Sequence, residues 1–253
     1  MKVFTLGFSD SGDNTFLAES HIYFSQCSKN KRLSLTELLR ISSDIAVEDF
    51  AQRGLTREFL AENNIAILVS RNSFKIHKMP FENQEIKLFT REEKPEQFQL
   101  VRSYEFTSSD GEPLISGLST WIVVDIASRR IIPTKNFTLR EEPTQTLSHN
   151  CEMPSRIAVS AEAVELCRRK VGYSDLDSNG HVNNSRYGNY ILDALPEDIL
   201  EQEISEFKIN YSKEAFLGEE MTIVGSFSED KKKAIVAGRT ERGTSFEALL
   251  AYK

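Results

Sequence analysis

One short run of the chain concentrates the residue types that can perform acid–base chemistry. Residues 173–187 read YSDLDSNGHVNNSRY and contain two aspartates, one histidine and three asparagines. A histidine exchanges protons near neutral pH, and a nearby carboxylate can orient it and stabilise its charged form. Each of these residue types is also common in ordinary turns. Their combination, with Asp177, Asn179 and His181 at alternate positions, indicates a catalytic loop.

The same run also begins like a calcium-binding loop. Asp175, Asp177 and Asn179 alternate and are followed by Gly180, as in the first half of an EF-hand loop. Such a loop needs a bidentate glutamate at its twelfth position, where this chain has Arg186. A guanidinium cannot replace that ligand. We therefore expect neither a metal nor a cofactor here.

The elements that must position this loop follow the same order twice. In the first half, Ser34 and Glu37 form a capping box that predicts the start of a long helix, and Gly54 predicts its end. In that box Glu37 is expected to reach back to the backbone amide of Ser34. A short helix is expected at 56–62. Strand-like patterns follow at 65–79, 85–90, 97–107 and 114–126.

The second half repeats this plan after a stretch rich in proline and polar residues at 133–154. A strand is expected at 164–173, a helix at 182–195, and further strands at 204–211, 221–227, 233–240 and 245–252. The sequence thus predicts an α+β fold built by duplication, with modules at 1–132 and 155–253 and a linker at 133–154.

Composition and charge exclude several classes of protein. The 253 residues carry a net charge of −7, which argues against a nucleic-acid partner. No stretch has the length of a membrane span or of a signal peptide's apolar region. The three cysteines, Cys27, Cys151 and Cys167, are odd in number and widely spaced, so a disulfide framework is not expected. A cytoplasmic location is therefore predicted.

The run from Ser174 to Asn184 resembles the signature of the acyl-ACP thioesterases, enzymes that act on acyl carrier protein (ACP). Segments 33–54, 67–71 and 118–125 extend the resemblance into the first half, and the chain looks like a bacterial-type member without a transit peptide. The resemblance implies two tandem hotdog modules, each a long helix wrapped by an antiparallel sheet. The first module is then expected to shape the acyl pocket.

The resemblance also implies the site residues. Asp177, Asn179 and His181 fall on active-site positions, and Glu214 is the fourth. Many plant members carry a cysteine after that glutamate, whereas this chain has Ala215. Activated water is therefore expected as the nucleophile, with the general base left open between Glu214 and His181. Asp177 would orient the imidazole. Asn179, or a backbone amide near a helix start at Val182, would donate to the carbonyl oxygen.

The implied activity is hydrolysis of fatty acyl-ACP to a free fatty acid and ACP. Two alternatives remain: hydrolysis of acyl-CoA, and a module that binds acyl chains without catalysis. The acidic carrier should dock on a basic patch. The two candidate clusters are Lys29, Lys31 and Arg32, and Arg168, Arg169 and Lys170. The sequence leaves open the acyl chain length and the oligomeric state, for which a homodimer is one alternative.

Overall fold

The computed structural model describes residues 5–8 and 15–253, and its strands form one antiparallel sheet. The strands of the first half are β1 (Thr5–Phe8), β2 (Phe16–His21), β3 (Ile65–Ile76), β4 (Glu85–Glu93), β5 (Leu100–Ser108), β6 (Pro113–Asp125) and β7 (Ile131–Ile132). Those of the second half are β8 (Val164–Lys170), β9 (Ile204–Tyr211), β10 (Glu220–Phe227), β11 (Lys233–Thr240) and β12 (Gly243–Tyr252). The order across the sheet is β1-β2-β4-β5-β6-β3-β9-β12-β11-β10-β8, with β7 beside β6.

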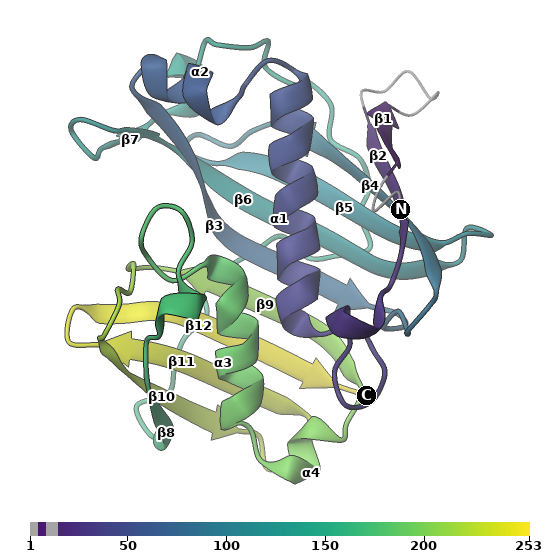
Figure 1. Cartoon of the computed structure of the whole chain (residues 1–253), viewed down its shortest axis with the longest axis vertical. Coiled ribbons are helices and arrows are strands. Elements are labelled where there is room, and N and C mark those ends of the chain that lie inside the picture. The colour runs from purple at the N-terminus through teal and green to yellow at the C-terminus, as the bar shows by residue number, and fades with distance from the viewer. Residues whose placement is uncertain (1–4, 9–14) are drawn as a thin grey trace.

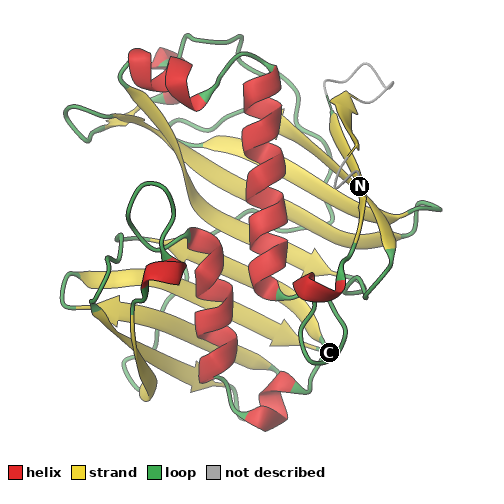
Figure 2. Ribbon diagram, in the orientation of Figure 1, coloured by secondary structure: helices red, strands yellow, loops and turns green. Residues whose placement is uncertain are grey.

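Helices cover one face of this sheet. They are α1 (Leu35–Gln52), α2 (Arg57–Glu62), α3 (Tyr187–Ala194) and α4 (Glu197–Leu200), with short 3-10 helices η1 (Phe24–Gln26), η2 (Thr134–Asn136), η3 (Tyr173–Asp175) and η4 (Asn184–Arg186). Figures 1 and 2 show α1 lying across the strands of the first half and α3 across those of the second. The predicted α+β class and the paired helix-on-sheet plan are confirmed. No described helix is both long and apolar enough to cross a bilayer.

Helix α1 begins and ends where the sequence predicts. The Ser34 hydroxyl accepts a hydrogen bond from the backbone amide of Glu37 at 3.2 Å, and Gly54 takes a φ of +85° after the last turn. The second half of the capping box is wrong. The Ser34 amide donates to the Gln26 carbonyl, and the Glu37 carboxylate accepts from Arg40 instead. A carboxylate gains more from a guanidinium than from a neutral amide, which explains the exchange.

The helix predicted at 182–195 begins later than expected. Val182 pairs with Leu176 as in a strand, and Asn183 then caps the short η4 helix by accepting from the backbone amide of Ser185. The regular helix α3 starts only at Tyr187. Val182 itself therefore belongs to the loop, and the helical stretch begins with η4, which Asn183 caps.

The two halves contact each other both within the sheet and between the helices. In the sheet, β3 pairs with β9, with Ser73 opposite Lys208. Between the helices, the Thr36 hydroxyl donates to the Asn189 side-chain oxygen at 2.6 Å. A Cβ at Gly188 would lie 2.6 Å from the Thr36 backbone nitrogen, so glycine is what permits this close approach. The shared sheet and helix contact fix the position of the second half's loop against the first half.

The segment predicted as a linker follows an irregular path beside the first half. It is fastened there by hydrogen bonds from the Lys94 amide to the Gln145 carbonyl, at 2.8 Å, and from the Leu147 amide to the Glu93 carboxylate, at 3.0 Å. The irregular path continues past residue 154 to the start of β8. The module boundaries at 132 and 155 stay a prediction.

A buried ion pair lies between α1 and the sheet of the first half. Arg102 Nη1 is 2.7 Å from Asp49 Oδ2, and their side chains are 1% and 0% exposed. Arg53 Nε contacts the other oxygen of the same carboxylate at 2.7 Å. The Arg102 guanidinium also lies over the Phe50 ring, 4.5 Å from its centroid. Because both charges are removed from water, each depends on the other.

Candidate active site

The loop between β8 and α3 is closed by its own backbone. Leu176 and Val182 pair across its base. The Asp177 amide donates to the His181 carbonyl at 2.9 Å, and the Gly180 amide donates to the Asp177 carbonyl at 3.0 Å. Gly180 has a φ of +83°, a conformation that glycine adopts without strain. This tight turn holds the side chains of residues 177–181 on one short segment.

The imidazole of His181 lies between two carboxylates. Its Nδ1 is 3.6 Å from Asp177 Oδ2, and its Nε2 is 3.7 Å from Glu214 Oε1. The His181 side chain is 22% exposed and that of Glu214 is 50% exposed, so the site is open to water. The structure thus brings together three of the four residues that the resemblance implied, from two separate segments.

Backbone pairing explains how Glu214 reaches the histidine. His181 forms an isolated bridge with Phe216, and the Val182 amide donates to the Ala215 carbonyl at 2.8 Å. The segment after β9 therefore runs alongside the loop. The Val182 amide is thus bonded within the protein, and the expectation that a backbone amide near Val182 serves a substrate carbonyl stays a prediction for its neighbours.

Asn179, the fourth predicted residue, lies on the other side of Asp177. Its backbone amide donates to Asp177 Oδ1 at 2.8 Å, and its side-chain Nδ2 is 3.4 Å from Asp177 Oδ2. Its side-chain oxygen accepts from Arg57 Nη2 at 2.7 Å. Arg57 was missed from the sequence. It lies in the other half of the chain, and no motif connects α2 with this loop.

Other polar residues of the run support the backbone. Asp175 Oδ2 accepts from the Gly172 amide at 2.9 Å, and its other oxygen is 3.8 Å from Arg169 Nη2. The Arg186 guanidinium donates to the Ser174 carbonyl. In the part of the chain that the structure describes, no three His, Cys, Asp or Glu side chains are grouped to hold a metal ion.

All three cysteines are free thiols in unfavourable surroundings for nucleophilic attack. Burial raises the pKa of Cys27, Cys151 and Cys167, which favours the protonated form. Ala215, at the position discussed for a cysteine, is fully buried. Across residues 15–253, no hydrogen bond or ion pair joins a thiol to His181 or Glu214.

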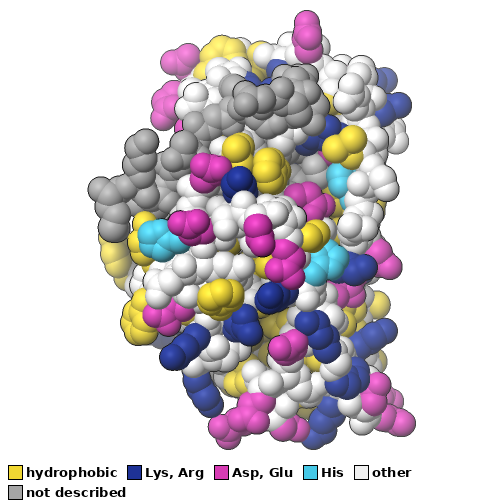
Figure 3. All heavy atoms as spheres, turned by 90° about the vertical axis from the view of Figure 1, so that its right-hand side faces the viewer, with side chains coloured by type: hydrophobic (Ala, Val, Ile, Leu, Met, Phe, Trp, Pro, Cys, Tyr) yellow, Lys and Arg dark blue, Asp and Glu magenta, His cyan; other side chains and the backbone are white. Residues whose placement is uncertain are grey.

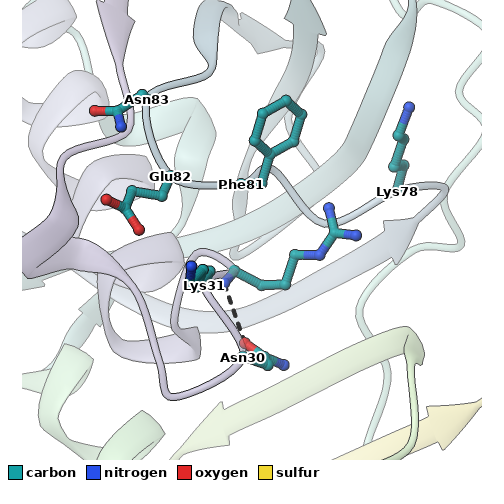
Figure 4. Close-up of a pocket in the computed structure, with 7 residues that line it drawn as sticks. Asn30, Lys31, Lys78, Phe81, Glu82 and Asn83 are labelled. Carbon is teal, nitrogen blue, oxygen red and sulfur yellow. Dashed lines mark hydrogen bonds between the residues drawn. The ribbon is translucent and has the colours of Figure 1, made fainter.

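The first half repeats the loop without its acid–base groups. There, Cys27 pairs with Leu33, Lys31 takes a positive φ of 59°, and Arg32 pairs with Phe81. The Cys27–Leu33 pair corresponds to the Leu176–Val182 pair, and Lys31 corresponds to Gly180. The Arg32–Phe81 bridge corresponds to the His181–Phe216 bridge, so Arg32 occupies the position that His181 has in the second half. Figure 4 shows this counterpart loop facing the segment of Phe81, around an open hollow of about 580 Å³. The duplication inferred from element order thus extends to the loops.

Comparison with known families covers both halves of the chain. Residues 13–138 match the model of the acyl-ACP thioesterase N-terminal domain, and residues 160–246 match that of the acyl-ACP thioesterase C-terminal domain. Among curated proteins, a chloroplastic palmitoyl-acyl carrier protein thioesterase of Gossypium hirsutum is 31% identical over 117 residues. That match covers 42% of this chain and 28% of the relative's length.

Solved structures show the same fold over almost the whole chain. An acyl-ACP thioesterase from Bacteroides thetaiotaomicron superposes with a TM-score of 0.87 at 21% identity, covering 97% of this chain and 100% of that one. The 12:0-ACP thioesterase from Umbellularia californica gives a TM-score of 0.79 at 15% identity, covering 97% and 99%. The paired hotdog architecture implied by the sequence is confirmed.

Proposed function

Because this chain belongs to the acyl-ACP thioesterase family, we propose that it hydrolyses fatty acyl-ACP to a free fatty acid and ACP. The observation that carries the proposal is the position of His181 between the carboxylates of Asp177 and Glu214. A site that only bound acyl chains would gain nothing from three ionisable groups around an open, polar turn. Their arrangement is suited to moving protons.

The reaction follows from these positions. A water molecule beside His181 Nε2 and the Glu214 carboxylate has two proton acceptors within reach. Its oxygen attacks the thioester carbonyl carbon while its proton passes to this pair. The resulting tetrahedral intermediate collapses, the C–S bond breaks, and the proton is returned to the leaving thiolate. Asp177, on the Nδ1 side, holds the imidazole in orientation. We assign the Asn179 side-chain amide, which contacts Asp177 on the Nδ1 side of the imidazole, as the donor to the carbonyl oxygen.

The acyl chain is expected to lie under α1, between the two halves. A small cavity of about 30 Å³ lies there, lined by α1, β3, β5 and β6 of the first half and by residues that follow His181. Its lining includes Ser43, Tyr104, Trp121, Asn184 and Tyr211. This volume corresponds to about one water molecule, so acyl binding requires some of these side chains to move.

The activity is tested by offering one acyl group on three donors. Release of free fatty acid from acyl-ACP, acyl-CoA and an uncharged acyl-N-acetylcysteamine thioester should be measured at equal concentration. The proposal expects the highest kcat/KM on acyl-ACP. A preference for acyl-CoA would assign the enzyme to CoA esters, and binding without release of fatty acid would identify an acyl-binding module.

Replacing all three cysteines with serine is expected to leave kcat within about twofold of wild type, since water and not a thiol attacks the carbonyl. The assay is fatty acid release by a variant whose thermal unfolding midpoint confirms folding. Loss of turnover in the folded variant, traced to one position by single substitutions, would point to a covalent thioester route instead.

The structure favours a docking surface other than the two clusters suggested by sequence. Arg168 pairs with Glu165 and Glu220, and the Arg169 guanidinium pairs with Asp193 and lies 3.5 Å from the centroid of the Tyr190 ring. These contacts pair the charges of Arg168 and Arg169 with carboxylates on the protein itself. The Lys29–Arg32 cluster lies in the counterpart loop beside the C-terminus, on the other side of helices α1 and α3 from the His181 loop (Figure 1). On that side, basic side chains are interspersed with acidic ones (Figure 3).

We place docking on the rim of the His181 loop, formed by Tyr173, Lys213, Leu217 and Arg242. All four are exposed. Lys213 adjoins Glu214, and its ammonium bonds the Arg242 carbonyl. The Arg242 guanidinium lies 4.7 Å from the centroid of the Phe216 ring, beside the bridge to His181. Its Nε is 3.8 Å from Glu219 Oε1, a longer contact than those of Arg168 with Glu165 and of Arg169 with Asp193. Two cations with two exposed apolar side chains suit an acidic protein surface.

Substituting Arg242 with glutamine is therefore expected to raise KM for acyl-ACP several-fold with kcat nearly unchanged. Higher ionic strength should have the same effect on wild type, because screening weakens the encounter of charged proteins. Neither change should alter turnover of the uncharged thioester. The matched control is Lys31→Gln in the counterpart loop, for which no effect is expected. An equal effect of both substitutions, or none from either, would exclude this rim as the docking surface.

A further inference from the structure

A contact from the first half of the chain bonds the His181 loop directly. Arg57 Nη2 donates to Asn179 Oδ1 at 2.7 Å, and Arg57 Nη1 donates to Ser178 Oγ at 3.3 Å. The guanidinium thus binds two consecutive side chains of a turn that lies more than 120 residues later in the chain. Bonds from a charged donor are stronger than neutral ones and fix geometry more closely.

The backbone at Arg57 is held firmly in place. It is the first residue of α2, whose cap, Thr56, accepts from the Phe59 amide at 3.2 Å. On either side of it, Leu55 and Leu60 are buried in the core of the first half. The backbone that carries the guanidinium is therefore held by a capped helix and two apolar anchors, while the side chain reaches across to the loop.

The contact determines which way the Asn179 amide points. A carboxamide has one accepting and one donating end. With Oδ1 bonded by Arg57, the donating Nδ2 is turned toward Asp177 Oδ2, at 3.4 Å. That same oxygen lies 3.6 Å from His181 Nδ1. A continuous chain of polar contacts therefore runs from Arg57 through Asn179 and Asp177 to His181.

We propose that Arg57 is a positioning residue, through which the first half of the chain orients the Asn179 amide and aligns Asp177 with His181. The inference rests on the proposed thioesterase function. It goes beyond that function because it makes the catalytic loop of the second half depend on a side chain of the first. Without Arg57, the amide can rotate and offer its oxygen to Asp177, which repels it.

Two alternative roles for Arg57 predict different effects of its substitution on kcat and KM. An arginine that docks the acidic carrier acts on KM for acyl-ACP and has no effect on an uncharged donor. An exposed arginine with no role beyond a surface contact alters neither kinetic constant. A positioning residue lowers kcat equally for both donors, and its effect depends on the presence of Asn179.

The test is a double-mutant cycle with Arg57→Ala, Asn179→Ala and the combined variant, assayed on acyl-ACP and on the acyl-N-acetylcysteamine thioester. Loss of the charge-assisted bond is expected to lower kcat by about 10-fold on both donors, with KM changed by less than about twofold. In the Asn179→Ala background, Arg57→Ala should add nothing. Arg57→Lys, which keeps the charge but not the two-pronged donor, should recover only part of the loss. Lys135→Ala, which removes an exposed cation from η2, is the matched control.

A second readout does not depend on activity. The side-chain amide signals of Asn179 in a ¹H–¹⁵N spectrum should shift in Arg57→Ala and stay in place in Lys135→Ala. Independent effects of the two substitutions in the cycle, a loss confined to KM for acyl-ACP, or unmoved Asn179 signals would overturn the inference. Failure of wild type to hydrolyse either donor would instead refute the proposed function, and the spectrum would still decide whether Arg57 orients Asn179.

Discussion

Replacing His181 with alanine is expected to lower kcat on acyl-ACP by a factor of about 10² to 10⁴. The imidazole lies between the two carboxylates of the site, with Asp177 on its Nδ1 side and Glu214 on its Nε2 side. Its removal leaves Glu214 alone, without its imidazole partner, to pass a proton between the attacking water and the leaving thiolate. The measurement is steady-state release of fatty acid, with KM determined in the same experiment.

Because the side chain is partly exposed and its one backbone contact is long, at 3.4 Å to the Val182 carbonyl, the variant should keep its fold. The matched control is His77→Ala in the first half, where the imidazole Nε2 lies 3.2 Å from the Ser116 hydroxyl and far from the carboxylates of the site. His77→Ala should retain near wild-type turnover. If folded His181→Ala does so as well, His181 has no catalytic role and the loop must be reassigned.

The second large effect concerns stability. Substitution of Asp49 by alanine is expected to reduce the free energy of unfolding by about 3 to 5 kcal/mol. The Arg102 guanidinium would then be left buried without its counter-charge, and Arg53 would lose its contact with the same carboxylate. The net contribution of such a pair can be small, but breaking it from one side is costly. The measurement is urea unfolding followed by tryptophan fluorescence.

The control for this prediction is an exposed pair. Arg168→Ala removes contacts to Glu165 and Glu220 at the surface, and should cost less than about 1 kcal/mol. A joint replacement, Asp49→Leu with Arg102→Met, should recover much of the stability lost in Asp49→Ala, since it removes both charges. An Asp49→Ala variant as stable as wild type would show that the Arg102 charge is neutralised by other means.

The parts of the site that lie close together in the chain could be predicted from the sequence. Asp177, Asn179 and His181 occupy alternate positions of one turn, so their types and spacing indicate the chemistry directly. Glu214 could be proposed only through the family resemblance, because backbone pairing after β9 brings it to the imidazole. Arg57 could not be predicted at all, because its contact depends on how the two halves pack.

Sequence signals for the helices and strands were likewise reliable only over short distances along the chain. The Ser34 cap and Gly54 correctly bounded α1, because both act within one helical turn. The start of α3 was placed too early, because the pairing of Val182 with Leu176 and its bond to Ala215 override helical periodicity. Strand β2 was missed. It is short and stabilised by pairing with β4, which follows α1 and α2 in the chain.

The central claim is that water, activated beside His181 and Glu214, cleaves the thioester without a covalent acyl-enzyme. It is tested most directly by one turnover of acyl-ACP with enzyme in excess in H₂¹⁸O, followed by mass spectrometry of the fatty acid and of the protein. The account predicts one ¹⁸O atom in the fatty acid, no acyl adduct on the protein and no ¹⁸O in the peptide containing Glu214. An acyl adduct on the protein, or label in the Glu214 carboxylate, would contradict it.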